Sequence, residues 1–296
     1  MGEFNKKCYC ADATIIEGIF GNLPSCVNSP VSQDNCSENE LLENDQPPTT
    51  SPIKSYTLAN KNSMEVVIIT WGATIVSIKT PDKYGKIVDV ALGLETLDDY
   101  MNPEFQIGCI LGRCADKVDS VRIKGREYFP FNSDGFGGRI WDSHVDGSSV
   151  VMSYLSADGE DGYPGDVLTT IRFRLTSDNT LEVKMKATTT KPTVINLSYG
   201  VFFNLAGHDA GEEEMKNHVV TLNCDRWIFE EEAGDGPVLY MSRGVGGTLM
   251  DFRIPRSLWE DDNCVLFNDG FPRNFCVIRS GDGETFVFRG YHRKTG

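Results

Sequence analysis

The sequence predicts an all-β protein whose main feature is a large antiparallel β-sandwich. Short segments rich in β-branched and aromatic residues follow one another along the chain, and turns containing glycine or proline separate them. Long apolar periodicity of the helical kind is absent from the sequence. Many short strands at short spacing are typical of antiparallel sandwiches.

Each predicted element follows from its local pattern. Residues 65–71 and 74–79 are β-branched runs that Gly72 separates, which predicts two strands joined by a sharp turn or bulge. Residues 170–175 alternate apolar and polar side chains and return over residues 181–186, which predicts the clearest hairpin in the chain. Further strands are predicted over residues 87–92, 150–155, 219–223 and 284–289, and a short helical turn over residues 94–100.

The composition divides the chain into three parts. Residues 1–25 form an N-terminal segment. Residues 26–53 form an insert in which five acidic residues and four prolines occur without any lysine or arginine up to Pro52. Such a segment buries too little apolar surface to offset its ordering entropy, so we predict that it is disordered. Residues 54–296 are predicted to form the sandwich domain.

The charge of the chain excludes several classes of function. There are 28 Lys and Arg residues against 43 Asp and Glu residues, a formal net charge of −15. Such a chain repels nucleic-acid phosphates and anionic lipids, so we predict neither nucleic-acid nor membrane partners. No apolar run reaches the roughly 18 residues of a membrane span, and the N-terminus lacks the apolar core of a signal peptide. We therefore predict a cytoplasmic protein whose nine cysteines are reduced thiols.

General catalytic motifs give no assignment. The sequence holds no glycine-rich nucleotide loop, no Walker loop and no His-Glu-x-x-His pattern. Cys8 and Cys10 lack a second cysteine pair at zinc-binding spacing, so neither a metal nor another cofactor is predicted. The four histidines are scattered, and the acidic residues 230–232 are expected to form a solvated loop face.

Three longer segments carry a family resemblance. Residues 158–165 read Asp-Gly-Glu-Asp-Gly-Tyr-Pro-Gly, residues 196–207 read Asn-Leu-Ser-Tyr-Gly-Val-Phe-Phe-Asn-Leu-Ala-Gly, and residues 111–117 read Leu-Gly-Arg-Cys-Ala-Asp-Lys. In this order they resemble the aldose 1-epimerase (galactose mutarotase) family, over residues 14–296 outside the acidic insert. The resemblance implies that family's large β-supersandwich, incomplete here at the C-terminus, and a hexose as the ligand.

The resemblance also implies a reaction in which a pyranose ring opens and recloses. A base removes the proton of the anomeric hydroxyl while an acid protonates the ring oxygen, so two positioned proton carriers are required. In this family a histidine is the acid, and the gap-free match of residues 196–207 puts Gly200 at its position. The family's base is a glutamate in strands that would follow Gly296.

Other positions of the family's sugar site are also changed. Asp116 and Lys117 stand where the family has an Asn-Arg pair that binds sugar hydroxyls, and this exchange gives up the planar guanidinium group. Pro272 stands where the family has a sugar-binding aspartate. A second family histidine lies in a Leu-His-Gly-Gly loop, which is either deleted before Gly135 or has Phe136 at the histidine position.

Aromatic residues near these positions have two interpretations. The family places the equivalent of Trp141 beside its sugar-binding loop, so Trp141 joins Asp116 and Lys117 as a predicted substrate contact. Tyr199, Phe202 and Phe203 are expected to pack in the core rather than to stack on a sugar.

Three hypotheses about function follow. The first is a protein of the family without epimerase activity, which binds a hexose weakly or contacts a protein partner through the acidic insert or an exposed sheet edge. The second is an active epimerase with a rearranged site that uses Asp116, Lys117 or residues 230–232 for proton transfer. The third is a truncated, non-functional product, which would expose sheet edges and aggregate.

Overall fold

The computed structural model describes most of the chain and divides it into two compact units. The first unit comprises residues 1–80 and 89–203, and the second comprises residues 81–88 and 204–296. Their boundary falls inside the range 54–296 that we predicted as one domain. The described residues are 6–9, 12–23, 51–102, 104, 106–115, 120–130, 135–231, 239–260, 263–264, 274–279, 281 and 284–296.

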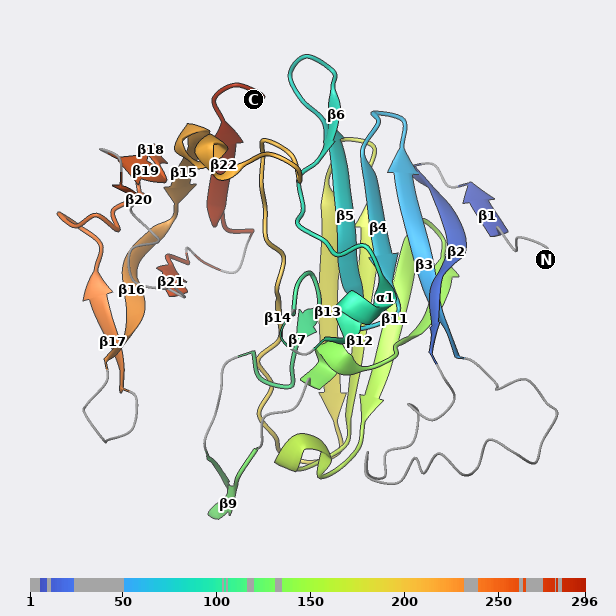
Figure 1. Cartoon of the computed structure of the whole chain (residues 1–296). Helices are drawn as coiled ribbons and strands as arrows, with labels where there is room; N and C mark the ends of the chain where they lie inside the picture. Colours follow the sequence, from blue (N-terminus) through green and yellow to red (C-terminus); the bar gives the residue numbers. More distant parts are fainter. Residues whose placement is uncertain are drawn as a thin grey trace. The chain divides into compact units, whose positions relative to one another are not determined.

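The first sheet of the first unit is an antiparallel meander (Figure 1). Its inward side chains alternate with outward ones, as in β3, where Ile53, Tyr56 and Leu58 are buried. Residues 51–53 of the predicted insert therefore belong to a strand, and its residues 26–50 lie outside the described part of the chain. The strands are β1 (Lys6–Tyr9), β2 (Ala13–Leu23), β3 (Ser51–Asn60), β4 (Glu65–Ile69) and β5 (Thr74–Pro81).

A second sheet of the first unit confirms the predicted hairpin. Residues of β12 pair with β13 in antiparallel register, with Phe173 opposite Val183. Every second side chain of β12 is buried, including Ile171 and Phe173, as the alternating pattern predicts. The strands are β10 (Asp142–Asp146), β11 (Ser149–Ser156), β12 (Val167–Leu175) and β13 (Leu181–Thr189).

The two sheets of the first unit face each other and form a sandwich, as predicted (Figure 1). The buried Tyr56 of β3 reaches across to β10, where its hydroxyl lies 2.9 Å from Ser143 Oγ. At the other end of β3, Asn60 Nδ2 donates to the Thr176 carbonyl at 2.9 Å. Apolar side chains from both sheets fill the space between them.

Short elements connect the sheets and carry the candidate site. The predicted helical turn is α1 (Leu97–Met101), which begins at a capping box formed by Thr96 and Asp99. Its Leu97 and Tyr100 pack with Trp71 in the core of the first unit. The other short elements are β7 (Ile110–Leu111), β8 (Val121–Ile123), β9 (Arg126–Tyr128), η3 (Gly135–Gly138), η4 (Glu160–Gly162) and β14 (Ser198–Tyr199).

The second unit contains two small three-stranded sheets. The strand predicted over residues 284–289 begins only at Phe288, and before it Asn223 binds the Phe286 carbonyl through its side chain and the Val287 carbonyl through its backbone. The elements are β6 (Ile87–Asp89, at the sequence boundary of the units), η5 (Glu212–Asn217), β15 (His218–Leu222), β16 (Cys224–Glu231), β17 (Leu239–Gly244), β18 (Arg256–Ser257), β19 (Trp259–Glu260), β20 (Asn263–Cys264), β21 (Asn274–Val277) and β22 (Phe288–His292).

One expectation for this unit was wrong. Glu230 and Glu231 are not in a loop but end β16, where they lie opposite Tyr240 and Leu239 of β17. Their place in the strand follows from the aromatic and β-branched run that precedes them. Within the described residues, we find no helix that is long and apolar enough to cross a membrane.

Candidate functional site

The candidate site is built around Gly200 in the first unit. Strands β7 and β14 pair in antiparallel register, with Tyr199 opposite Ile110. The ladder continues past the strand ends, since the Gly108 N–H donates to the Gly200 carbonyl at 2.7 Å and the Gly200 N–H donates to the Cys109 carbonyl at 3.0 Å. Backbone pairing therefore holds residues 106–109 directly against Gly200.

This pairing leaves no room for a side chain at Gly200. A Cβ atom there would lie 2.9 Å from the Gln106 carbonyl oxygen, a separation that real Cβ atoms essentially never show. The obstacle is backbone rather than a side chain that could rotate away. Gly200, which we predicted at the position of the family's acid, thus has no proton carrier and is closed by residues 106–109.

Three aromatic residues lie beside Gly200 in the sequence. The side chain of Tyr199 is covered by the protein, whereas those of Phe202 and Phe203 are exposed. Tyr199 packs in the core as expected: its hydroxyl donates to the Ala73 carbonyl at 2.9 Å, and burial raises its pKa well above the usual value. The expectation for Phe202 and Phe203 was wrong, because their side chains are 54% and 55% exposed. Their backbones bond to residues 91–92, which holds the chain in place without covering the rings.

The glycine-rich turn η3 packs against the same strands. A Cβ atom on Gly137 would meet Cys109 Sγ at 2.9 Å, so only a glycine allows this approach. Phe136, which occupies the histidine position in one of our two alignments, is 1% exposed. The turn therefore directs its one large side chain into the core and not toward Gly200.

Trp141, which we predicted as a sugar contact, lies in the core in this structure. Its indole is 1% exposed, and its Nε1–H donates to the Phe136 carbonyl at 3.1 Å. The ring packs on Phe136 and Tyr154 at centroid separations of 6.0 and 5.7 Å. No face of the indole is open to a ligand in this arrangement. Asp116 and Lys117, the other predicted contacts, lie outside the described residues, as does Pro272.

Arg113, which lies in the family segment 111–117, binds the family segment 158–165 and the two residues before it. Its guanidinium is 1% exposed and donates to the carbonyls of Ser156 at 3.2 Å, Ala157 at 2.7 Å and Pro164 at 3.2 Å. Two further bonds reach Ser156 Oγ at 2.8 and 3.0 Å. Burial lowers the pKa of Arg113. This side chain organises residues 156–164 and does not face a ligand.

Glu160, the central carboxylate of that motif, is also fully engaged. Its Oε1 accepts from Arg139 Nε at 3.1 Å and from the Tyr154 hydroxyl at 2.6 Å, and its Oε2 accepts from Ser156. Burial acts to raise the pKa of Glu160, but these hydrogen bonds outweigh it and the pKa is lowered. A carboxylate held in this way is a poor general base, so Glu160 acts in structure rather than in proton transfer.

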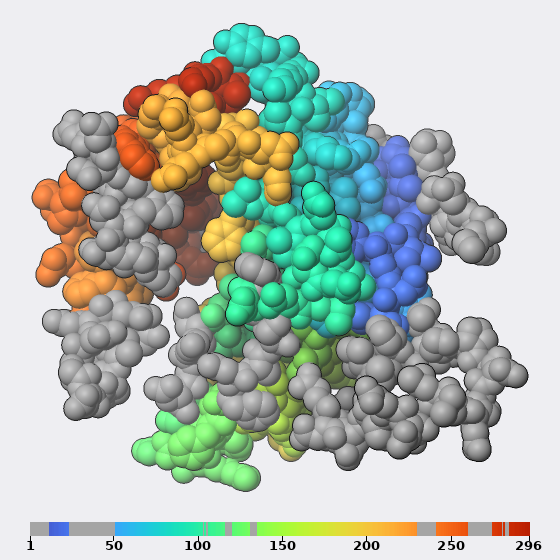
Figure 2. Space-filling view, in the orientation of Figure 1, coloured from blue at the N-terminus to red at the C-terminus, as the bar shows by residue number. Residues whose placement is uncertain are grey.

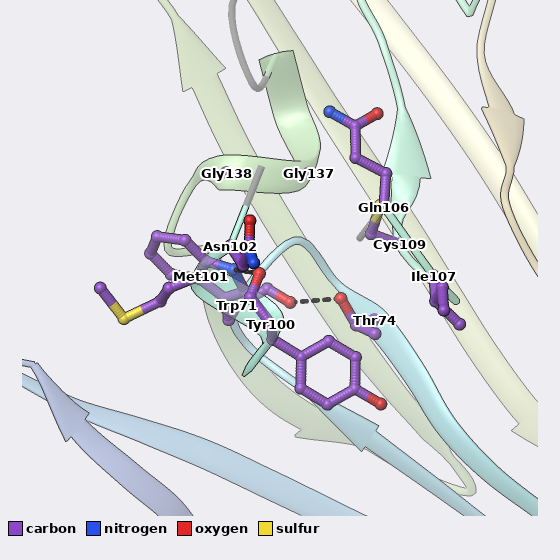
Figure 3. Close-up of a pocket in the computed structure, with 10 residues that line it drawn as sticks. All are labelled: Trp71, Thr74, Tyr100, Met101, Asn102, Gln106, Ile107, Cys109, Gly137 and Gly138. Carbon is purple, nitrogen blue, oxygen red and sulfur yellow. Dashed lines mark hydrogen bonds between the residues drawn. The ribbon is translucent and has the colours of Figure 1, made fainter. Parts of the chain in front are cut away.

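A small cavity opens between α1, η3 and residues 106–109 (Figure 3). Its volume is about 20 Å³, which suits about one water molecule and not a pyranose. Trp71 donates its Nε1–H to the Tyr100 carbonyl at 3.2 Å, and Thr74 donates its hydroxyl to the Trp71 carbonyl at 2.6 Å. These polar groups therefore form hydrogen bonds within the cavity lining. Among the side chains of the lining, Asn102 and Gln106 carry amides.

Comparison with known proteins agrees with the geometry. The family model for aldose 1-epimerase matches residues 54–291. The chain belongs to the aldose 1-epimerase family. The predicted family and fold are confirmed.

Individual relatives extend the comparison. The chain is 30% identical to galactose mutarotase of Rattus norvegicus over 249 residues, 79% of this chain and 70% of the relative. It is 28% identical to aldose 1-epimerase of Escherichia coli K12 over 258 residues, 80% of this chain and 72% of the relative. The crystal structure of an aldose epimerase homologue from C. elegans aligns with a TM-score of 0.67 at 23% identity, covering 80% of this chain and 75% of the other, which shows the same fold.

Of the positions that we predicted for the site, the structure places Gly200 and η3 against one shared residue and Trp141 in the core. Gly200 and η3 both contact Cys109, while Trp141 lies in the core and packs on Phe136 of η3. Sequence reasoning missed the covering of Gly200 by residues 106–109. No local signal could have shown it, because it depends on the pairing of two strands about 90 residues apart.

Proposed function

We propose that this chain is a member of the aldose 1-epimerase family that does not interconvert hexose anomers. The observation that carries the proposal is Gly200, which stands at the position of the family's acid and is covered by the Gln106 carbonyl. The phenylalanine that one alignment puts at the second histidine position, Phe136, is turned into the core. General acid or base catalysis typically contributes about 10²–10⁴-fold each, so their loss removes most of the rate enhancement.

Anomeric exchange tests this proposal directly. Purified chain is added to freshly dissolved α-D-galactose or α-D-glucose in weak buffer, and the two anomeric proton signals are followed by one-dimensional NMR. We expect interconversion at the buffer-only rate, with an active mutarotase as the positive control. Acceleration in proportion to protein concentration would contradict the proposal and favour the rearranged site, so Asp116→Ala and Lys117→Ala would then be measured first.

Restoring the histidine alone is expected to fail. In Gly200→His, the new side chain meets the Gln106 carbonyl, so residues 106–109 must move before an imidazole fits. We expect no gain in anomeric exchange and a loss of about 2–4 kcal/mol in the free energy of unfolding, since a backbone clash in a packed site must be relieved by displacement. Gly211→His is the matched control, because no atom lies within 4 Å of a Cβ there. Faster exchange in Gly200→His would show that the site opens in solution.

A hexose is the ligand class that we propose for any remaining binding function. Family membership supports it, and Asp116 and Lys117 are the residues that we propose for polar contacts. Saturation-transfer NMR with D-galactose measures such binding, and the double variant Asp116→Ala/Lys117→Ala is expected to abolish the signal. Retention of the signal would place the sugar elsewhere on the chain.

A cytoplasmic location and reduced cysteines also belong to this proposal. Cys109, Cys224 and Cys276 carry thiols in the described part of the chain, which supports a reducing environment. Contact with a protein partner, through residues 26–53 or through an exposed sheet edge, also belongs to this proposal.

A further inference from the structure

Two buried histidines meet in the second unit. His218 begins β15 and His292 ends β22, and the two strands pair so that these residues lie opposite each other. Their ring centroids are 5.0 Å apart, and the residues are only 5% and 1% exposed. Two titratable rings in contact inside a protein couple the local structure to pH.

The hydrogen bonds of His218 require the neutral ring. Its Nδ1 lies 3.0 Å from the Glu214 carbonyl oxygen, which can only accept, so Nδ1 carries the proton. On the other side of the ring, the backbone N–H of Leu205 donates to Nε2 at 2.9 Å, so Nε2 must be unprotonated. Both partners are backbone groups, and neither can reverse its role.

His292 connects the same turn to the C-terminal residues. Its Nε2 donates to Glu214 Oε2 at 3.0 Å, and its Nδ1 accepts the backbone N–H of Thr295 at 3.3 Å. The Thr295 hydroxyl donates to the Leu205 carbonyl at 3.1 Å. The two histidines therefore bind both backbone groups of Leu205, His218 directly and His292 through Thr295. Figure 2 shows the C-terminal residues (dark red) against residues 204–217 (amber).

We propose that His218 is a pH-sensitive latch that holds β22 and residues 293–296 against the turn at residues 204–207. A proton added to Nε2 of His218 would point at the Leu205 N–H, so two donors would face each other and the bond would be lost. The same proton would put a positive charge beside the His292 ring. Acidification therefore releases the turn and, with it, the C-terminal strand.

The charged groups around the latch keep their charge as the pH falls, so His218 is the group that responds to pH. Hydrogen bonds from Lys294 and Asn217 hold the pKa of Glu214 at about 2, so this carboxylate stays ionised through the physiological range. Lys294 Nζ lies 2.6 Å from Glu214 and offsets its charge, and the His292 ring faces His218. Burial, followed by the effect of the His292 ring, lowers the pKa of His218, although the backbone of Glu214 acts against this.

The direction of the pH effect follows from that lowering. The unfolded histidine titrates near the ordinary value of about 6.5, and the folded His218 titrates below it. The open form therefore binds more protons than the closed form below about pH 6.5. The contribution of His218 is fully present above that pH and is lost as the pH falls from about 6.5 through the folded pKa.

Hydrogen exchange of the full chain, read by mass spectrometry, tests the latch. Protection factors, corrected for the intrinsic pH dependence of exchange, are compared at pH 7.5 and 5.5 for two peptides. We expect residues 286–296 to lose protection about three- to tenfold at pH 5.5, as one extra proton on the open form requires. The hairpin at residues 167–189, in the first unit, is expected to keep its protection.

Variants separate the latch from a general effect of acid. In His218→Gln a side-chain carbonyl can still accept from the Leu205 N–H but does not titrate, so protection of residues 286–296 should become independent of pH. His144→Gln removes an exposed histidine on β10 and should behave as the natural chain does. Unchanged protection of residues 286–296 in the natural chain, or an equal loss in residues 167–189, would overturn the proposal. The comparison of the two peptides decides this even if His218→Gln does not fold.

Discussion

Replacing Arg113 with methionine is expected to lower the free energy of unfolding by about 3–5 kcal/mol. Methionine keeps much of the volume of the side chain but none of its donors. The carbonyls of Ser156, Ala157 and Pro164 then lose their partner in a buried site. Each buried acceptor left without a hydrogen bond costs about 1–3 kcal/mol, and the network loses its cooperative order as well. Urea unfolding followed by circular dichroism measures the change.

Arg122→Met is the matched control for this prediction. Arg122 lies on β8 with a side chain that is 73% exposed and a single ion pair to Glu127 at 3.9 Å. Exposed pairs of this kind contribute about 0–1 kcal/mol, so the control should leave the midpoint nearly unchanged. If Arg113→Met were as stable as Arg122→Met, the two family motifs would not depend on each other as the hydrogen bonds indicate.

Replacing Gly72 with alanine is expected to destabilise the chain by about 3 kcal/mol or more. Gly72 has a φ of 61°, and its Cβ atom would lie 2.4 Å from the Gly137 carbonyl oxygen. The substitution must displace η3, because Gly72 also donates its N–H to the Arg139 carbonyl at 2.8 Å. Thermal unfolding measures the loss, and near-ultraviolet circular dichroism reports the displaced Trp141.

Gly147→Ala separates backbone strain from the clash. Gly147 has a φ of 58° in the β10–β11 turn, and a Cβ atom there meets nothing within 4 Å. It should therefore show the conformational cost alone, about 1 kcal/mol. Equal losses in the two variants would mean that η3 does not press on Gly72, and the account of the turn would fail.

The strands could be predicted because their signal is local. Apolar and polar residues alternate along β12, and the alternation alone states which side chains face inward. The same is true of the turn at Gly72, where a glycine between two β-branched runs indicates a conformation that other residues rarely adopt. The family motifs are local as well, so the sequence was sufficient to predict the fold and the family.

The candidate site was predicted only in part. The prediction that Gly200 stands at the position of the family's acid comes from the sequence, but the closure of Gly200 is not visible there. It depends on the carbonyl of Gln106, which β7 brings against β14. The same holds for Trp141. Its predicted place beside a loop came from the sequence, whereas its burial depends on packing against Phe136 and Tyr154.

The sequence by itself determined the all-β class, the main strands, the family and the glycine at position 200. Only the tertiary structure decided that this position is closed, that Arg113 and Glu160 act in structure, and that His218 and His292 meet. The physical reason is that residue type and periodicity are properties of neighbouring residues. The space beside a side chain, and the groups that fill it, are set by segments far apart in the chain.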